Sequence, residues 1–322
     1  MIIKLQKASK LNSRHKQYLK DFLGNYKKLN KSDHTIKNYA ADLIKFLDWY
    51  EHAIGEDASK TNARNIDAYK DYLSGVSFFK RQTLFKRFIG KIRKRKPQVL
   101  KQQPLSVGSR RRHISSIKNF FEYMVQAYDG KHRGFKENPV KSKIHSIALK
   151  DADINHTKLL GHGDFDSLLK VTRNQEQRLI LYLLYYGGLR LEELTRVKKS
   201  SFSQKNHTLS LIRKGGSLHT FKLQNFENIF ELLVKHTTDK NIKGDDIFLN
   251  RFKFPLSSRS MYSKVNLLIK KDGIAQKGLG PHSFRKACAT NMYIECKDIL
   301  KVRNYLNHKD AKVTQTYIEY FD

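Results

Sequence analysis

The sequence predicts a mainly helical protein of two domains, with one small β-hairpin in the second domain. Three observations support this fold class. Apolar residues recur at helical spacing through most of the first half. A helix-breaking, polar and basic stretch follows near residue 140, and an alternating segment with a glycine turn lies near residue 210. A chain of 322 residues also has the length of about two domains.

Four helices are expected in the first half, because the apolar residues there follow one helix face. Serine or aspartate stands where the second and fourth helices can begin, and both residue types are good N-caps. The expected helices cover residues 14–29, a stretch from Ser32 or Asp33 to Tyr50, a shorter stretch around Ile66 to Leu73, and a stretch from Ser106 or Ser109 to Met124.

The charge balance indicates a polyanionic partner. The chain has 63 Lys and Arg against 30 Asp and Glu, a formal net charge of +33 and a pI near 10.0. Each phosphate that such a surface neutralises releases counterions, which favours nucleic acid binding. A lysine-rich solvated surface, or a biased genome, is the alternative explanation.

Residues 78–104 form the most basic stretch, and Phe and Leu are interleaved with the charges. This stretch has two interpretations, a contact with the DNA backbone or a basic surface helix followed by a loop, and both can hold. The candidate DNA-contacting residues, taken from here and from the start of the fourth helix, are Arg81, Lys86, Arg87, Lys91, Arg93, Arg110, Arg111 and Arg112.

Membrane, secretory and metal-binding classes are not favoured. No apolar run reaches the ~18 residues of a membrane span, and the N-terminal stretch has no apolar core of a signal peptide. Cys288 and Cys296 show no metal-ligand spacing, so we expect reduced thiols in a cytoplasmic protein and no metal site.

Asn138-Pro139 and the polar residues after it mark the expected domain boundary. We expect a helical, DNA-binding first domain at 1–140, a linker at 141–155 and a second domain at 156–322. A linker between two basic domains suits a clamp that closes around a duplex.

The second domain is expected to be mixed. Helices are predicted over 163–173 and 174–186, with Gly187-Gly188 ending the second of these, and a short helix over LEELTRV. Residues 207–212 and 218–223 alternate like paired strands around the turn RKGGS, which makes a hairpin with Lys214 at its tip. From 226 onward the pattern is helical to the end.

Five places in this half carry residues that suit a single phosphate. Taken singly each is weak, because an arginine at a glycine turn or a lysine at a hairpin tip is usually a solvated surface residue. His282 and Arg285 follow Pro281 and share one helix face at i,i+3 spacing. The full series is Arg190, Lys214, His282 with Arg285, His308 and Tyr317.

In this order, GGLRLEEL, the hairpin lysine, HSFRK, LNH and TQTY resemble the tyrosine recombinases, or phage integrases, a family that includes the bacterial Xer proteins. The resemblance maps the family's catalytic Arg, Lys, His-x-x-Arg, His or Trp, and Tyr onto the series above, and gives Glu193 and Lys286 supporting roles. It extends to the family's core-binding domain through Thr35, Tyr39, Asp42, Leu43, Phe46, SRRRHISSIKNFFEYM and Asn138-Pro139.

The resemblance implies that Tyr317 attacks a phosphodiester and forms a 3′-phosphotyrosyl bond. Paired guanidiniums fit the nonbridging oxygens of such a phosphate and offset the charge of the transition state. His282 is the candidate proton acceptor, His308 a hydrogen-bond donor, and Lys214 the proton donor to the leaving 5′-oxygen. No metal or ATP is implied. Tyr320 is a rival nucleophile, which its spacing from His308 disfavours.

The implied partners are duplex DNA with an inverted-repeat core site and three further copies of the chain in a tetramer, with a partner recombinase or accessory protein left open. The implied location is cytoplasmic and nucleoid-associated. Integration, excision, chromosome-dimer resolution and inversion all fit. The alternatives are a type IB topoisomerase, a non-catalytic DNA-binding relative, and a general RNA- or membrane-binding basic protein; the last explains the charge but not the motif series.

Overall fold

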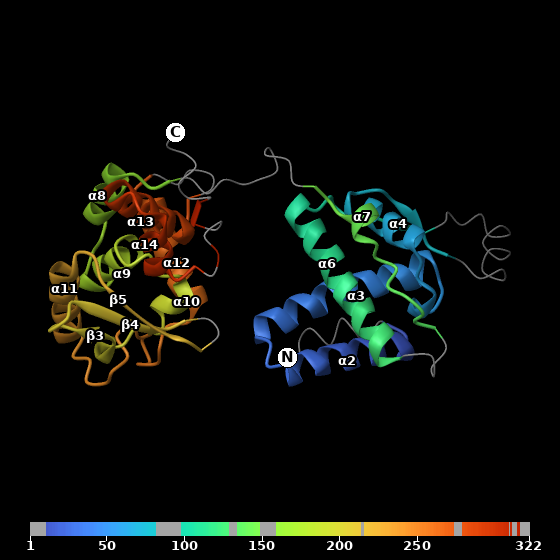
Figure 1. The fold of residues 1–322 in the computed structure, drawn as a ribbon, viewed down its shortest axis with the longest axis horizontal. Helices are drawn as coiled ribbons and strands as arrows, with labels where there is room; N and C mark the ends of the chain where they lie inside the picture. The colour runs from blue at the N-terminus through green and yellow to red at the C-terminus, as the bar shows by residue number, and fades with distance from the viewer. Residues whose placement is uncertain are drawn as a thin grey trace. The chain divides into compact units, whose positions relative to one another are not determined.

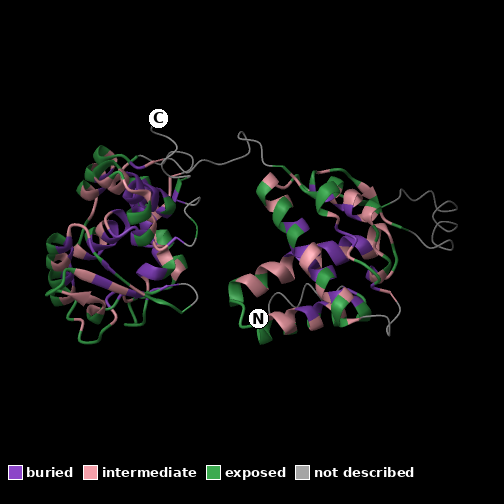
Figure 2. Ribbon diagram, in the orientation of Figure 1, coloured by how far each residue is buried: buried purple, intermediate pink, exposed green. Residues whose placement is uncertain are grey.

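The computed structural model describes residues 11–81, 98–128, 134–148, 159–213, 216–273, 279–308, 310 and 314–315. The chain divides into two compact units, Met1–Ile154 and Asn155–Asp322, coloured blue to green and yellow-green to red in Figure 1. Each unit buries its own hydrophobic core, and Figure 2 shows the buried residues inside each. In the described part of the chain, no helix has both the length and the apolar character needed to cross a membrane.

The N-terminal unit is helical, as the sequence predicts. Two serine caps fix where its long helices begin, because each hydroxyl accepts a backbone N–H that the helix leaves unpaired. Ser32 accepts from Thr35 at 3.2 Å, and Ser106 from Ser109 at 3.3 Å, so Ser106 is the cap of the fourth expected helix. The helices are α2 Ser13–Lys28, α3 Asp33–Ala53, η1 Ala58–Lys60, α4 Ala63–Leu73, α6 Val107–Ala127 and α7 Ser142–His145.

Aromatic side chains hold the N-terminal core together. The ring of Phe22 on α2 lies 5.6 Å from that of Phe120 on α6, edge to face, and Trp49 on α3 lies 5.1 Å from Tyr69 on α4. All four side chains are almost completely buried. Such pairs contribute about 0.5–1.5 kcal/mol each beyond the burial of their area.

The most basic stretch, residues 78–104, contains a two-stranded antiparallel sheet. Strand β1 (Phe78–Phe79) pairs with β2 (Val99–Leu100). Each strand has two residues, too few to show the alternation by which a strand is recognised in sequence, so this pair was not predicted. Most of the residues between the strands, 82–97, lie outside the described residues and include Lys86, Arg87, Lys91 and Arg93.

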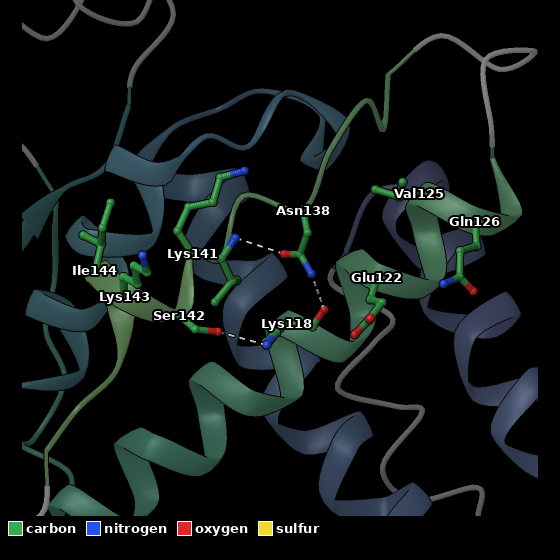
Figure 3. A pocket seen from close by; sticks show the side chains of 10 residues that line it. Lys118, Glu122, Val125, Gln126, Asn138, Lys141, Ser142, Lys143 and Ile144 are labelled. Atoms are coloured by element: carbon green, nitrogen blue, oxygen red, sulfur yellow. Dashed lines mark hydrogen bonds between the residues drawn. The ribbon is translucent and has the colours of Figure 1, made fainter.

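The segment after α6 packs back onto the N-terminal unit. Figure 3 shows how Asn138 organises it: the side-chain amide donates to the carbonyl of Lys118 at 2.9 Å, and its oxygen accepts from the backbone of Val140 at 3.0 Å. Lys118 in turn donates to Ser142 at 2.9 Å. The pocket beside these bonds, about 650 Å³, is lined by α6 and residues 138–144.

The C-terminal unit is built around one apolar helix. Helix α9 (Gln175–Tyr185) buries Leu179, Ile180, Leu181, Leu183 and Leu184, which lie on more than one face. A helix apolar around its circumference belongs in a core, and α9 lies among other helices in Figure 1. The remaining helices are α8 His162–Lys170, α10 Leu191–Leu194, η3 Lys199–Ser201, α11 Phe226–Asp239, α12 Ser258–Lys271, α13 Pro281–Cys296 and α14 Ile299–Leu306.

The predicted hairpin is confirmed. Strands β4 (Thr208–Ile212) and β5 (Leu218–Lys222) pair antiparallel, with Leu209 opposite Phe221 on the buried face. A short strand that was not predicted, β3 (Phe202–Ser203), extends the sheet to the order β3-β4-β5. The mainly helical fold class with a small sheet is therefore confirmed.

The expectation of helix from residue 226 to the end is wrong between α11 and α12. Asn241 and Lys253 there have positive φ angles of 47° and 63°, which a right-handed helix excludes. Asn250 accepts from the backbone N–H groups of Phe252 and Phe254 at 2.8 and 3.1 Å, an alternative to helical bonds. Pro255 then pairs with Leu249 in an isolated bridge.

Candidate active site

Glu193 is the centre of an arginine cluster in the C-terminal unit. Its carboxylate, 2% exposed, accepts from the backbone N–H of Arg190 at 2.8 Å and from the Arg190 guanidinium at 2.9 Å. Arg213 donates to it at 2.7 Å, and Nη1 of Arg285 lies 3.8 Å from its Oε2 atom. One carboxylate therefore gathers three guanidiniums, from the start of α10, the end of β4 and the first turns of α13.

A glycine turn brings Arg190 to this place. Gly188 has φ +58°, and a β-carbon there would lie 2.5 Å from Cδ2 of Leu306 and 3.0 Å from Sγ of Cys288. Only glycine meets both demands without strain, so the turn can pass close to α13 and α14. Arg190 then begins α10, and its side chain is 40% exposed.

Arg285 ties three elements together. Its side chain is 2% exposed, and its Nη1 and Nη2 atoms donate to the carbonyls of Gly188 at 2.5 Å and Leu306 at 2.7 Å. Both acceptors are main-chain oxygens at the ends of elements, where helical bonding leaves carbonyls unpaired. Arg285 thereby fixes the turn before Arg190 and the end of α14 relative to α13.

His308 follows directly on α14. Asn307 ends that helix with φ 50°, and His308 returns its backbone N–H to the carbonyl of Arg303 at 3.0 Å. Its ring is 7% exposed, and Nδ1 lies 2.9 Å from the hydroxyl oxygen of Thr314, which is fully buried. Burial, followed by the charges of Arg285, Arg190 and Arg213, lowers the pKa of His308 to about 4, so the ring is neutral at pH 7.

His282 lies one helical turn before Arg285 and is exposed. Partial desolvation of the ring and the charges of Arg285 and Arg190 lower its pKa, which keeps it able to accept a proton at neutral pH. Lys286, the next residue after Arg285, is 6% exposed, and burial lowers its pKa as well.

The cluster carries a surplus of positive charge. Burial raises the pKa of Glu193, but the Arg213 ion pair, the Arg190 N–H and Arg285 outweigh it, and the net pKa is lowered. Three guanidiniums against one ionised carboxylate leave two positive charges. A half-exposed guanidinium beside such a surplus is an arrangement that binds an anion such as phosphate.

Comparison with known proteins identifies the family of this chain. Residues 158–322, half of the chain, match the phage integrase family. The chain belongs to this family. It is similar to tyrosine recombinase XerD of Oceanobacillus iheyensis, with 25% identity over 89% of this chain and 87% of that protein. It is similar to tyrosine recombinase XerC of Lactobacillus delbrueckii subsp. bulgaricus, with 27% identity over 67% of this chain and 73% of that protein.

Solved structures of tyrosine recombinases share the fold. XerH bound to palindromic difH substrate superposes with a TM-score of 0.68 at 16% identity, over 98% of this chain and 89% of that one. A lambda integrase dimer bound to a COC′ core site gives 0.64 at 16% identity, over 94% and 76%. As a tyrosine recombinase, the chain is a DNA breaking-rejoining enzyme.

The structure brings four of the predicted site residues of this recombinase into one cluster: Arg190, Glu193, Arg285 and His308, with His282 at its exposed side. Lys214 and Tyr317 lie outside the described residues. Sequence reasoning missed Arg213 and Thr314. A signal for Arg213 existed, because alternation places it on the same strand face as the buried Leu209 and Leu211; for Thr314 there was none.

The described DNA-contact candidates of this recombinase mostly have partners within the chain. Arg81 donates to the carbonyl of Ile54, Arg110 donates to the Ser74 hydroxyl at 2.7 Å, and Arg112 makes two hydrogen bonds to Asp42. Arg111 is exposed. Their contact with DNA stays a prediction, as does that of the four candidates within 82–97.

Proposed function

We propose that this tyrosine recombinase cleaves and rejoins duplex DNA at a specific site, with Tyr317 as its nucleophile. The observation that supports the proposal is the arginine cluster around Glu193. Two guanidiniums of the family's motif, Arg190 and Arg285, are held by one carboxylate beside a neutral His308, with excess positive charge. A phosphodiester under attack gains negative charge, and fixed donors of this kind stabilise it.

The proposed step is a transesterification that needs no oxidant and no energy source. The Tyr317 oxygen attacks phosphorus and loses its proton to His282, while the bond from phosphorus to the 5′-oxygen breaks. That oxygen takes a proton from Lys214 and leaves as a 5′-hydroxyl. The 3′-phosphotyrosyl bond retains the energy of the phosphodiester, so a 5′-hydroxyl from another strand can reverse the step and join the two strands.

Arg190 and Arg285 take unequal parts in the DNA-free state. Arg190 is 40% exposed and can meet a nonbridging oxygen directly, whereas Arg285 and His308 are 2% and 7% exposed. Contact of a phosphate with these two side chains therefore requires neighbouring residues to move. DNA binding supplies the free energy for such a rearrangement if the bound state makes better contacts.

Thr314 supports a definite role for His308. A histidine that donates to phosphate through Nε2–H must accept a hydrogen bond, or none, at Nδ1. The Thr314 hydroxyl, 2.9 Å from Nδ1, can supply that proton. In this arrangement the ring is neutral, is fixed in orientation and carries its proton on Nε2, which is the tautomer that can donate to a phosphate.

We further propose the division of labour expected from the sequence: residues 1–140 bind DNA, 141–155 connect the domains, with α7 of this stretch packed on the N-terminal unit, and 156–322 carry the chemistry. XerH bound to palindromic difH and the lambda integrase dimer on a core site support a duplex target with inverted repeats. Exchange between two such sites involves four strand cleavages, which a tetramer of one active site per subunit provides, with or without an accessory protein.

A covalent trap tests the proposal. The full-length protein is mixed with nicked duplexes from its own genome and denatured, and the DNA that stays attached is sequenced. Adducts that share an inverted-repeat core, persist in Tyr320→Phe and vanish in Tyr317→Phe are the expected result. Adducts without sequence preference would favour a topoisomerase, and loss in Tyr320→Phe instead would reassign the nucleophile. An absence of adducts on any DNA would contradict the proposed reaction.

A further inference from the structure

We propose that Arg213 is a positioning residue for the proton donor: it fixes the hairpin that carries Lys214 onto Glu193. The inference rests on the proposed function, in which Lys214 protonates the leaving 5′-oxygen. It concerns a residue outside the motif series. Arg213 precedes Lys214 directly in the chain, so wherever its backbone is held, the attachment point of Lys214 is held as well.

The position of Arg213, directly after β4, is unusual for a charged residue. Leu209 and Leu211 of β4 point into the core, and Arg213, two residues further on, is 3% exposed on the same face. Strand geometry thus places a guanidinium where an apolar side chain would continue the pattern. There it donates from Nη1 to Glu193 at 2.7 Å and lies over the ring of Phe221, 5.6 Å from its centre.

Stability does not explain this arrangement. The Nε and Nη2 atoms of Arg213 are buried and have no hydrogen-bond partner among the described residues. A buried charge with unmet donors costs folding free energy, and a well-packed apolar side chain of similar size is often as good or better. Glu193 also keeps other partners, since Arg190 donates to both of its oxygens. Arg213 therefore contributes something other than stability.

The main chain around Arg213 shows what it contributes. Its N–H donates to the carbonyl of Ser217 at 2.9 Å, and its carbonyl accepts from Gly216 at 3.0 Å. These bonds close the hairpin, and the Glu193 ion pair attaches the closed hairpin to the carboxylate that also holds Arg190. The side chain of Arg213 thereby sets the position of the hairpin relative to Arg190.

A fixed position of the hairpin matters for proton transfer. A general acid must lie within about 2.6–3.2 Å of the atom it protonates, and lysine reaches that atom on a long, flexible stem. Fixing the residue before Lys214 reduces the positions that its ammonium group samples. Loss of Arg213 should therefore mimic a partial loss of Lys214.

Leaving-group chemistry separates this role from others. In a substrate whose scissile 5′-oxygen is replaced by sulfur, the attack of Tyr317 breaks a P–S bond and releases a thiolate. A thiol has a pKa of about 8.5, so the thiolate leaves without a proton donor. Variants that lack only proton donation are therefore rescued by sulfur, whereas variants with weakened phosphate binding are not.

The experiment compares both substrates, built on the site recovered by the covalent trap, in the full-length enzyme. Lys214→Ala should cleave the oxygen substrate about 10²–10⁴-fold more slowly than the native enzyme. Arg213→Met should cleave it more slowly by about tenfold or more. Both variants should cleave the sulfur substrate at close to the native rate. Arg213→Lys, which keeps a charge beside Glu193, repeats the test if Arg213→Met does not fold. Arg173→Met, an exposed arginine of the same unit, controls for the loss of one charge.

Two outcomes overturn the inference while the proposed function stands. Arg213→Met could be slow on both substrates, which would make it a phosphate-binding or purely structural residue, or it could match the native enzyme on both. A different result would contradict the proposed function itself. If the native protein forms no adduct through Tyr317, both the proposed function and this inference are wrong. If the sulfur substrate does not restore the rate of Lys214→Ala, Lys214 is not the proton donor.

Discussion

Each unit of this recombinase buries one carboxylate among arginine and histidine side chains, but the two clusters differ in charge balance. In the N-terminal unit Asp42, 1% exposed, accepts two hydrogen bonds from Arg112 and one from Ser116, and it lies 3.3 Å from His113. In the C-terminal unit three arginines share Glu193. The first cluster has one guanidinium for one carboxylate, and the second has three.

The difference separates a structural cluster from a chemical one. Around Asp42 the one guanidinium that binds the carboxylate is matched by it, and the carboxylate oxygens have several donors, so the cluster ties α3 to α6. Around Glu193 two positive charges are left over, and two donors of Arg213 meet no acceptor among the described residues. An anion can complete the second cluster but has no role in the first. Similar contacts between arginine and carboxylate thus have a structural role around Asp42 and a chemical role around Glu193. The number of guanidiniums for each carboxylate distinguishes the two roles.

The largest effect should follow from removing the exposed guanidinium of the second cluster. Arg190→Ala is expected to lower the rate of adduct formation about 10³-fold, as loss of a transition-state donor does, while gel-shift affinity changes little, since the basic surface as a whole supplies it. Both are measured on the trapped site. A collapse of affinity together with cleavage would show that binding and chemistry are not separable at Arg190.

Removing the carboxylate of the first cluster should affect stability instead. Asp42→Ala leaves Ser116 and the Nε2 side of His113 without their buried carboxylate, while Arg112, half exposed, can turn to solvent. We expect a loss of about 3 kcal/mol in unfolding free energy. The measurement is urea unfolding followed by the fluorescence of Trp49, the single tryptophan, which is buried in the N-terminal core.

The matched expectation for Asp42→Ala is normal cleavage once it is folded and saturated with DNA. If the unfolding midpoint stays at the native value, the cluster is not structural. If the folded variant cannot cleave, the contrast between the two clusters is wrong, and Asp42 acts on the chemistry.

Local patterns made much of the fold predictable. The serine caps at Ser32 and Ser106 and the glycine turn after α9 act through neighbours in sequence, so sequence reasoning found the elements that they delimit. The strands β1, β2 and β3 have two residues each and depend on partners elsewhere in the chain. The stretch after α11 looked helical by spacing, whereas its Asn250 and positive-φ residues form turns.

The candidate site, like the fold, was predictable from the sequence only in part. Arg190, Glu193, Arg285 and His308 were predicted through the order of their motifs, because that order is distinctive even though each residue alone is weak. Their convergence on one carboxylate could not be read from spacing, since it depends on how α10, α13 and β4 pack. Arg213 was visible as a charged residue on an apolar strand face, but only its pairing with Glu193 gives that position a meaning.

The smallest effect concerns the two buried histidines, whose pKa values are both low mainly because of burial but whose charged neighbours differ. Burial lowers the pKa of His113 to about 4, Lys45 and Arg112 add to the shift, and Asp42 opposes it. Burial and three arginines lower that of His308 to the same value. Because both folded values lie below the usual 6.5, the unfolded chain takes up protons first as the pH falls. The contribution of these two histidines to stability is therefore level above pH 6.5 and declines between 6.5 and 4.

Arg190→Ala separates the two histidines. Removing this guanidinium takes a positive charge away from His308 and His282, so the pKa of both should rise toward 6.5, while that of His113 stays low. Titration of the histidine ring protons by NMR in the full-length protein follows each site. If His308 does not move, its low pKa comes from burial and the surplus of charge around Glu193 does not reach it. If His113 moves as well, the variant has disturbed the fold, because no arginine of the Glu193 cluster contributes to the pKa of His113 in the described structure.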